Sequence, residues 1–466
     1  MRPIAPLRRA ACLGSVVLVS VTVGLPGLAP ARAASADANP YFDAPFTARP
    51  NAAAFGQDPS WAPDSRVLSN EADAAGIDQV WVSTLGGADR HCLTCGQPGP
   101  NGFPQARPQG DWILFCSWRD APATFGAPCL GGIGSDLYVM RPDGTDVTRL
   151  TAPGLPDEPS GVAYDNYHPA WSPDGSRIVW THVGYAPDSA GGTQWTMLVA
   201  DFDPRAARLG APTVVGPAID SGYETQVWAP DGSGFLYTAM GQGDAGWLNL
   251  ELYYLRLSGH GASLAHPQIV HLTDDSPAWD EQAVFTPDMR DVIWMSSRGS
   301  PTWYQTVITA ARQVGFDPPS QNDTFGPMFE LTISDPGFHT DLYERDLATG
   351  AVRRLTDEHA IVPEFYFDPS GRTLLWSDPG HGGTSVGRFA LASVPARVGP
   401  HVTPVAAWVG APRHPGPTPP PVPATPRATS LPAVVVQGAQ LLDSQLRQLA
   451  AQLQGLPQGP RCFREP

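Results

Sequence analysis

A short hairpin motif recurs six times in this chain, and it limits the possible folds more than any other feature. In each copy an apolar strand leads into a Pro-Asp-Gly or related turn, and a strand rich in β-branched or aromatic residues follows. Proline presets φ at the first corner of such a turn, and Asp and Gly tolerate the conformations after it. The motif therefore predicts β-hairpins rather than helix starts. The copies read YHPAWSPDGSRIVW at Tyr167–Trp180, ETQVWAPDGSGFLY at Glu224–Tyr237, EQAVFTPDMRDVIW at Glu281–Trp294, PEFYFDPSGRTLLW at Pro363–Trp376, DPSWAPDSRVLS at Asp58–Ser69 and FPQARPQGDWILF at Phe103–Phe115.

A second pair of strands follows most of these hairpins. The segments Asp136–Thr151, DLYVMRPDGTDVTRLT, and Asp341–Thr356, DLYERDLATGAVRRLT, are nearly superimposable, and looser copies begin at Gln79 and Glu251. The repeating unit thus has four strands, and four-stranded units repeated along a chain predict the blades of a β-propeller. We expect an all-β fold with six blades over residues 58–410, with an insertion near 301–339 in the fifth and with residues 34–57 available to close the ring.

The combination of W-S-P-D-G with D-L-Y and R-L-T resembles the repeat of the TolB-like β-propeller family. The resemblance covers roughly residues 59–395 and implies six blades. TolB itself also carries a separate N-terminal α/β domain, which we do not expect here because only residues 34–57 separate the predicted export signal from the first hairpin. The resemblance therefore implies the fold and argues against a literal TolB role.

The N-terminus predicts export. Arg2, Arg8 and Arg9 precede an apolar run at 10–28, and Ala31-Arg32-Ala33 supplies the small-x-small pattern of a signal peptidase site. We expect residues 1–33 to be a cleaved secretory signal peptide and the mature protein to be secreted or periplasmic. Glycines and prolines interrupt the run before it reaches the roughly 20 apolar residues that a spanning helix needs, so no membrane span is expected.

The charge balance excludes some partners. The chain has 29 Lys plus Arg, all of them Arg, against 45 Asp plus Glu, for a net charge of −16. Such a surface repels phosphate backbones, so nucleic acid is not expected as a partner. Cations and neutral ligands are compatible with it.

The C-terminus has a different composition. Residues 411–432 are rich in proline and predict an extended, semi-rigid linker. Residues 433–466 contain Leu442, Leu446, Leu449 and Leu453, whose spacing places them on one face of a short helix. Two interpretations remain open: the helix docks on the propeller, or it mediates self-association through a short coiled coil.

Catalytic motifs give only weak signals in this sequence. HExxH and Walker patterns are absent, and GTSVG at 383–387 and GQGDAG at 241–246 match GxSxG and GxGxxG by their letters alone. The cysteines form one group, Cys92, Cys95, Cys116 and Cys129, in which a zinc site is an alternative to disulfides. In an exported protein disulfides are favoured, so we expect Cys116 to pair with Cys129. Cys92 and Cys95 either pair with each other or cross to the neighbouring blade.

Polar residues recur at one repeat position that should face the central channel. The innermost strand of each blade lines the channel, and the residue three before the anchor aromatic samples it. These residues and their neighbours could hold a divalent cation such as Ca²⁺ or Mn²⁺, or could simply hydrogen-bond ordered water. The candidates are Asp58, His168, Glu224, Gln282 and Glu364, with Thr225 and Glu281 beside them.

Two functional hypotheses follow. The first is an exported, non-catalytic binding protein that presents its channel mouth and loops to a protein, peptide or glycan. The second is a metal-assisted carbohydrate lyase or hydrolase with its site in the channel, as a weak resemblance to oligogalacturonate lyases implies. Those enzymes use several channel histidines, whereas this chain offers one.

Overall fold

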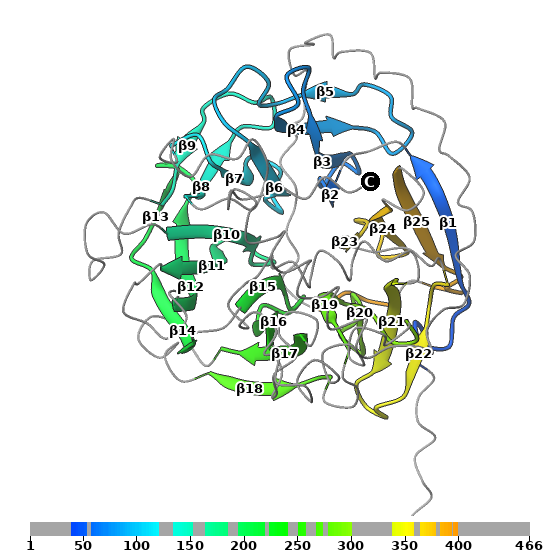
Figure 1. The fold of residues 1–466 in the computed structure, drawn as a ribbon. Helices are drawn as coiled ribbons and strands as arrows, with labels where there is room; N and C mark the ends of the chain where they lie inside the picture. The colour runs from blue at the N-terminus through cyan, green and yellow to red at the C-terminus, as the bar shows by residue number, and fades with distance from the viewer. Residues whose placement is uncertain are drawn as a thin grey trace, which may run out of the picture. The chain divides into compact units, whose positions relative to one another are not determined.

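The computed structural model contains six β-sheets arranged as the blades of a propeller (Figure 1). It describes residues 39–53, 57–120, 134–151, 164–184, 194–219, 223–240, 250–257, 267–273, 278–300, 338–357, 364–378, 383–393 and 395–398. These residues form strands and no helix, so the predicted six-bladed, all-β fold is confirmed. No helix among them could cross a membrane. The predicted signal peptide, proline-rich linker and C-terminal helix lie outside the described residues.

The first three blades follow one another along the chain, each beginning with its innermost strand. The first blade consists of β2 (Gln57–Trp61), β3 (Val67–Ala72), β4 (Asp78–Ser83) and β5 (His91–Cys92). The second consists of β6 (Asn101–Ala106), β7 (Ile113–Ser117), β8 (Asp136–Met140) and β9 (Thr148–Arg149). The third consists of β10 (Tyr164–Trp171), β11 (Arg177–Gly184), β12 (Gln194–Asp203), β13 (Arg208–Leu209) and β14 (Thr213–Ile219). The third blade has a fifth strand because both β13 and β14 pair with β12.

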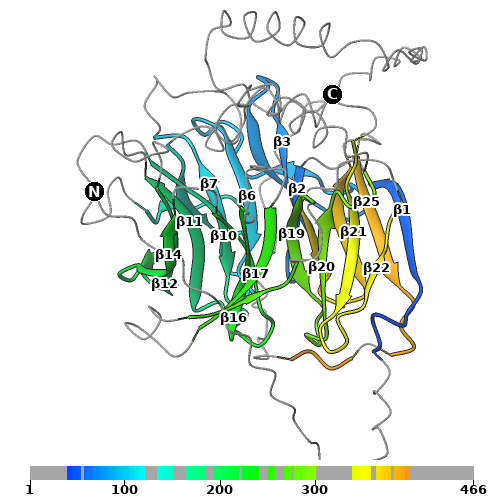
Figure 2. The same ribbon diagram turned by 60° about the horizontal axis from the view of Figure 1, so that its bottom comes forward.

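The remaining blades complete the ring. The fourth blade consists of β15 (Tyr223–Trp228), β16 (Gly234–Met240), β17 (Leu250–Arg256) and β18 (Gln268–His271). The fifth consists of β19 (Asp280–Phe285), β20 (Asp291–Ser296), β21 (Asp341–Asp346) and β22 (Val352–Arg354). The sixth consists of β23 (Phe365–Phe367), β24 (Thr373–Asp378), β25 (Gly383–Phe389) and β1 (Phe46–Ala53). The outer strand of the last blade thus comes from the N-terminal side, where β1 lies beside β25 (Figure 2). In this pairing Phe46 is opposite Phe389.

The recurrent Pro-Asp-Gly segments form the tight turns between the first two strands of each blade. In the third blade the Ser172 N–H donates to the carbonyl of Arg177 at 2.9 Å, and the Asp174 side chain accepts from the Ser176 N–H at 3.0 Å. Gly175 adopts a left-handed φ of 63°. Ser65 and Met289 adopt the same left-handed conformation at the corresponding position of their blades, so the hydrogen bonds of the turn impose the backbone even where Gly is missing.

A buried threonine explains why D-L-Y recurs together with R-L-T. In the second blade the Leu137 N–H donates to Thr151 Oγ1 at 3.0 Å, and that hydroxyl donates in turn to Asp136 Oδ1 at 2.6 Å. One hydroxyl thereby joins the backbone of the third strand to the acid at its start. We call this arrangement the threonine clamp. It recurs, with N–H to Oγ1 distances of 2.8–2.9 Å, at Thr94 with Gln79, Thr273 with Glu251 and Thr356 with Asp341.

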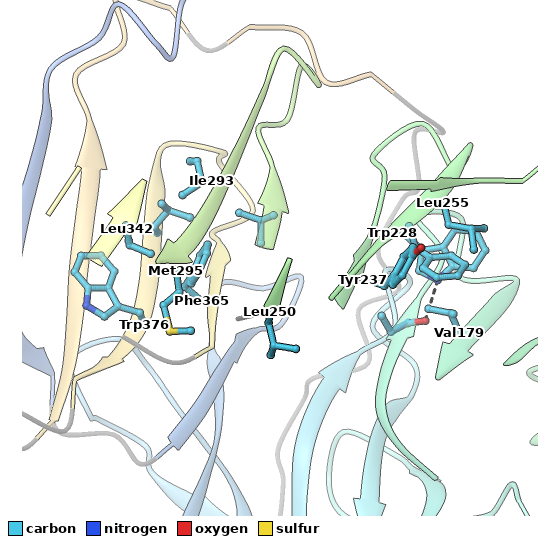
Figure 3. Close-up of a cluster of buried hydrophobic side chains, with 14 of the residues drawn as sticks. Val179, Trp228, Tyr237, Leu250, Leu255, Ile293, Met295, Leu342, Phe365 and Trp376 are labelled. Carbon is cyan, nitrogen blue, oxygen red and sulfur yellow. Dashed lines mark hydrogen bonds between the residues drawn. The ribbon is translucent and has the colours of Figure 1, made fainter. Parts of the chain in front are cut away.

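The anchor tryptophans join neighbouring blades. Trp171 Nε1 donates to the carbonyl of Gln105 at 3.1 Å, and Trp228 Nε1 donates to the carbonyl of Ala170 at 3.1 Å. Trp61 makes the same bond to the sixth blade. The rings of Trp171 and Trp228 are buried, and Trp228 belongs to an apolar cluster built from several blades (Figure 3).

An acidic cluster beneath the N-terminal segment fixes that segment to the fifth blade. Asn39 Nδ2 donates to Asp291 Oδ1 at 2.6 Å and to Asp346 Oδ2 at 2.8 Å. Burial raises the pKa of Asp291 to about 8, and the charge of Glu344 raises it further in the same direction. Burial likewise raises the pKa of Glu344 to about 7, although Arg353 opposes this.

The first prediction concerns the threonine clamp. Thr356→Val keeps the shape of the side chain but leaves the Leu342 N–H and Asp341 Oδ1 without their partner in a buried site. We expect the free energy of unfolding to fall by about 1–3 kcal/mol. Urea unfolding checks this, with Thr349→Val on the exposed turn as the matched control. Equal losses in the two variants would contradict the clamp.

The second prediction concerns the acidic cluster. Because the folded-state pKa of Asp291 is raised above its unfolded value, the folded protein holds a proton that the unfolded chain has lost between about pH 4 and 8. Stability should therefore fall as the pH rises through this range. Asp291→Asn keeps an acceptor for Asn39 and removes the titration, so its stability should fall less. Urea unfolding gives the free energy of unfolding of both proteins at each pH. The same pH dependence in the unmodified protein and in Asp291→Asn would disprove the prediction.

Candidate functional site

The two faces of the ring carry connections of different length. Because neighbouring strands are antiparallel, the tight first-to-second turns lie on one face. The second-to-third connections and the links between blades lie on the other, which we call the loop face. Counted along the sequence between strand ends, the longest of these connections are 297–340, 118–135 and 150–163. Loops grouped on a rigid scaffold are where binding residues usually concentrate.

The innermost strands carry bulges at the repeat position that the sequence singles out. The register shifts within β2, β6, β10, β15 and β19. Four residues at this position are left-handed although none is glycine, a conformation that costs energy and often marks functional sites. They are Asp58, Phe103, His168 and Gln282, with φ of 46–52°.

The bulge of the fifth blade has a visible effect on side chains. In a regular strand, the consecutive residues Glu281 and Gln282 would face opposite sides. Here Glu281 hydrogen-bonds Glu224 of the fourth blade, while Gln282 hydrogen-bonds Glu364 of the sixth. Both side chains therefore reach the centre of the ring.

His168 and Glu364 meet across the axis. His168 lies on β10 of the third blade and Glu364 immediately precedes β23 of the sixth, and these blades are opposite each other in the ring. Even so, Nδ1 of His168 is 4.0 Å from Oε1 of Glu364. The Phe103 ring of the second blade lies against the imidazole, with centroids 4.8 Å apart.

Further bonds extend from this pair. Tyr366 donates to Glu364 Oε2 at 3.0 Å, and Gln105 Nε2 donates to the Tyr366 hydroxyl at 2.8 Å. On the other side, Tyr167 donates to Glu224 at 3.2 Å and Trp279 Nε1 donates to Glu281 at 2.6 Å. We refer to Asp58, His168, Glu224, Glu281, Gln282, Glu364 and Tyr366 as the axial cluster.

The axial cluster is acidic, with Glu281, Gln282 and Glu364 buried and its other members half-buried. Burial raises the pKa of Glu364 well above its usual range, and the charge of Asp58 raises it further. Burial and the neighbouring Glu281 do the same to the pKa of Glu224, which donates its proton in the hydrogen bond to Glu281. No arginine is among the main influences on these three glutamates. Burial also lowers the pKa of His168 to about 4, so the imidazole is neutral at pH 7 and supplies no positive charge.

The predicted residues thus occupy different roles. His168, Gln282 and Glu364 come together at the axis. Asp58 accepts a hydrogen bond from Asn70 and acts on Glu364 through its charge. Glu224 contacts Glu281, and Thr225 donates to the backbone carbonyl of His168 at 2.5 Å.

Sequence reasoning missed two members of this region. Phe103 occupies the same repeat position as His168, but its blade carries Ala106 instead of an anchor aromatic. Tyr366 follows Glu364 by two residues, and strand alternation could have placed both on one side.

The arrangement does not fit a divalent metal. Within the part of the chain that the structure describes, no group of three or more His, Cys, Asp or Glu side chains is arranged to hold a metal ion. The carboxyl groups instead bond to one another, to Tyr and Trp donors and to Gln282. We therefore assign no metal-dependent step to the cluster.

The structure selects one of the two alternatives for Cys92 and Cys95 and shows Cys116 without the predicted bridge. Cys92 and Cys95 form a disulfide with each other. Cys116 is a free, fully buried thiol, so the structure lacks the predicted bridge from it to Cys129, which lies outside the described residues. The cause is strand alternation: Cys116 shares its face of β7 with Leu114, inside the apolar contact with the third blade.

Comparison with known proteins adds fold-level similarities. No family model and no curated protein matches the chain. Similar solved structures include TolB from Acinetobacter baumannii, at 13% identity and a TM-score of 0.42, covering 72% of this chain and 65% of that one. An oligogalacturonate lyase in complex with manganese shows 12% identity and a TM-score of 0.42 over 74% of this chain and 90% of that one. A puromycin hydrolase shows 13% identity and a TM-score of 0.43, covering 73% of this chain and 47% of that one. TolB is thus among the propellers that the chain resembles, and the fold assignment itself rests on the strand pairing.

The third prediction tests the state of Cys116. Burial raises the pKa of its thiol well above the usual range, and the charge of Asp165 adds to this, so the reactive thiolate does not form in the folded protein. Iodoacetamide should leave Cys116 unmodified under native conditions and alkylate it after unfolding. Peptide mapping under non-reducing conditions checks this. A disulfide-linked peptide that contains Cys116 and Cys129 would show that Cys116 is not a free thiol.

Proposed function

We propose that this protein is an exported, non-catalytic binding protein. Its loop face receives a protein, peptide or glycan, and the axial cluster accepts a positively charged or hydrogen-bond-donating group of that ligand. One observation carries the proposal: among the described residues, Glu224, Glu281 and Glu364 gather at the axis of the ring and bond to carboxyl, phenol, indole and amide groups, while His168 beside Glu364 is neutral.

The charge of the cluster supports this ligand class. An isolated buried carboxylate is costly, and here the folded protein reduces the cost by keeping protons on the glutamates. A ligand ammonium or guanidinium group can displace such a proton and supply the missing counter-charge. Affinity should therefore rise with pH, because fewer protons compete at higher pH.

The bulged strands support a site that is built in advance. Asp58, His168 and Gln282 hold left-handed conformations that a regular strand would avoid, and the hydrogen bonds of the blades fix them. Preorganised side chains lose less entropy when a ligand binds. The neutral imidazole of His168 can accept or donate one hydrogen bond to the same ligand group.

The fourth prediction tests binding at the axis. The mature protein is screened against arrays of peptides with free or acetylated amines and of amino or neutral glycans, and affinities are measured for the ligands found. Glu364→Ala and His168→Ala should each weaken binding about tenfold or more, which corresponds to roughly 1.4 kcal/mol. Affinity for the free amine should increase between pH 6 and pH 8.

Controls separate binding from folding. Thr349→Val, on the turn face, should bind as the unmodified protein does. Trp171→Ala should instead cost about 3–5 kcal/mol of stability through the cavity it creates. Full affinity in both axial variants would place the site elsewhere on the loop face.

The alternative hypothesis, a metal-assisted carbohydrate lyase or hydrolase, has its own measurements. Elemental analysis after dialysis would have to find stoichiometric Mn or Ca. Cleavage of a polysaccharide by the metal-loaded protein would then replace the binding proposal.

A further inference from the structure

The first blade departs from the clamp pattern of the other blades. In the second, fourth and fifth blades, a basic residue two positions before the clamp threonine pairs with the acid at the start of the third strand. These pairs are Arg149 with Asp136, His271 with Glu251 at 3.5 Å, and Arg354 with Asp341 at 2.5 Å. In the first blade the two positions hold Cys92 and Gln79, so acid and base are both replaced by uncharged residues.

The clamp of the first blade nevertheless forms. The Val80 N–H donates to Thr94 Oγ1 at 2.9 Å, and that hydroxyl donates to Gln79 Oε1 at 2.6 Å. The Cys92–Cys95 disulfide encloses Thr94 and Leu93 in its small ring. A covalent bond thus holds the threonine where an ion pair assists it in the other blades.

The same small ring holds the contact between the first and second blades. Leu93 is buried among side chains of the second blade, including Ile113 and Phe115. Its carbonyl lies so close to Gly144 that a Cβ there would be 2.6 Å away. Opening the ring would therefore loosen the clamp and this contact together.

The two sulfurs differ in access. Cys92 is buried, whereas Cys95 is partly exposed on the segment that leads toward the second blade. The Cys95 N–H also lies 2.9 Å from Cys92 Sγ and donates to it. An external thiolate can reach the Cys95 sulfur, and the N–H stabilises negative charge on Cys92 as it leaves.

We infer that Cys92–Cys95 is a thiol–disulfide exchange site for an external dithiol, and that its reduction releases the clamp of the first blade. A dithiol thiolate attacks Cys95 Sγ, which forms a mixed disulfide and expels the Cys92 thiolate. The second sulfur of the dithiol, as a thiolate, then attacks the first dithiol sulfur, which is bonded to Cys95, and the Cys95 thiolate leaves. Two electrons pass from the dithiol to the protein disulfide, and the dithiol ends as a cyclic disulfide.

The test uses the folded mature protein with dithiothreitol, followed by alkylation, peptide mapping and amide hydrogen exchange. Cys92 and Cys95 should become alkylated while Cys116 does not. Exchange of the Val80 amide should accelerate about tenfold, the scale of one lost hydrogen bond, whereas the Leu137 amide in the second-blade clamp should not change. Resistance of the disulfide to dithiothreitol in the folded state, or an unchanged Val80 amide, would overturn the inference.

Variants test the order of attack and the clamp. Cys92→Ser, which leaves Cys95, should form a mixed disulfide with oxidised glutathione faster than Cys95→Ser does, and the reverse order would refute access through Cys95. Combining Gln79→Asp, Cys92→Arg and Cys95→Ser gives the first blade an acid–arginine pair like Asp136 and Arg149 of the second blade. This variant should keep the Val80 amide slow with or without dithiothreitol. If it does not fold, the unmodified protein with and without dithiothreitol still decides the outcome.

Discussion

In each of at least four blades, the outer half depends on the hydroxyl of one threonine. It accepts a backbone N–H from the third strand and donates to the side chain at the start of that strand, so a single group satisfies two polar atoms that would otherwise be costly to bury. At the inner edge of three blades, an indole N–H bonded to the preceding blade has the corresponding effect. Between these two contacts, apolar side chains from adjacent sheets fill the wedge.

The centre of the ring follows a different rule from the blades. In the blades, several buried carboxylates have arginine partners, as Asp136 and Asp341 do, although Asp291 is held by Asn39. At the axis Glu224, Glu281 and Glu364 have other carboxyl groups, phenols and an amide instead. A ring needs only shape and hydrogen bonding at its axis to be stable, so an excess of acid there calls for an explanation outside stability. The proposed ligand offers one, because its cationic group would pair with these carboxyl groups.

Much of the fold could be predicted from the sequence because turns and strands are local properties. Pro-Asp-Gly favours a turn through its own residues, and the recurrence of the hairpin along the chain marks the blades. The Thr of R-L-T could be seen as a repeated letter, but its bonds to an acid 15 residues earlier appear only once the two strands pair.

The axis and the cysteines show where local reasoning ends. Counting three residues back from each aromatic identifies His168 and Glu364, but it does not show that they meet, since this depends on the closure of the ring. The count also assumes a regular strand, whereas the bulge at Gln282 brings Glu281 to the axis as well. The predicted bridge for Cys116 relied on compartment and loop length. Alternation with Leu114 instead directs the thiol into the core, and Cys129 lies outside the described residues.

The closing blade has a consequence for how the chain folds. Three strands of that sheet come from Phe365–Phe389 and the fourth from Phe46–Ala53, so the register between Phe46 and Phe389 joins nearly the two ends of the propeller. Contacts this distant in sequence carry a large loop-closure entropy and form late. Until the sixth blade exists, β1 has no strand to pair with, and the first five blades form an open arc whose two end faces are exposed. A chain that stops short of Gly383 would leave β1 without a partner, and one that stops short of Phe365 would also leave the inner seam of the first blade without its partner.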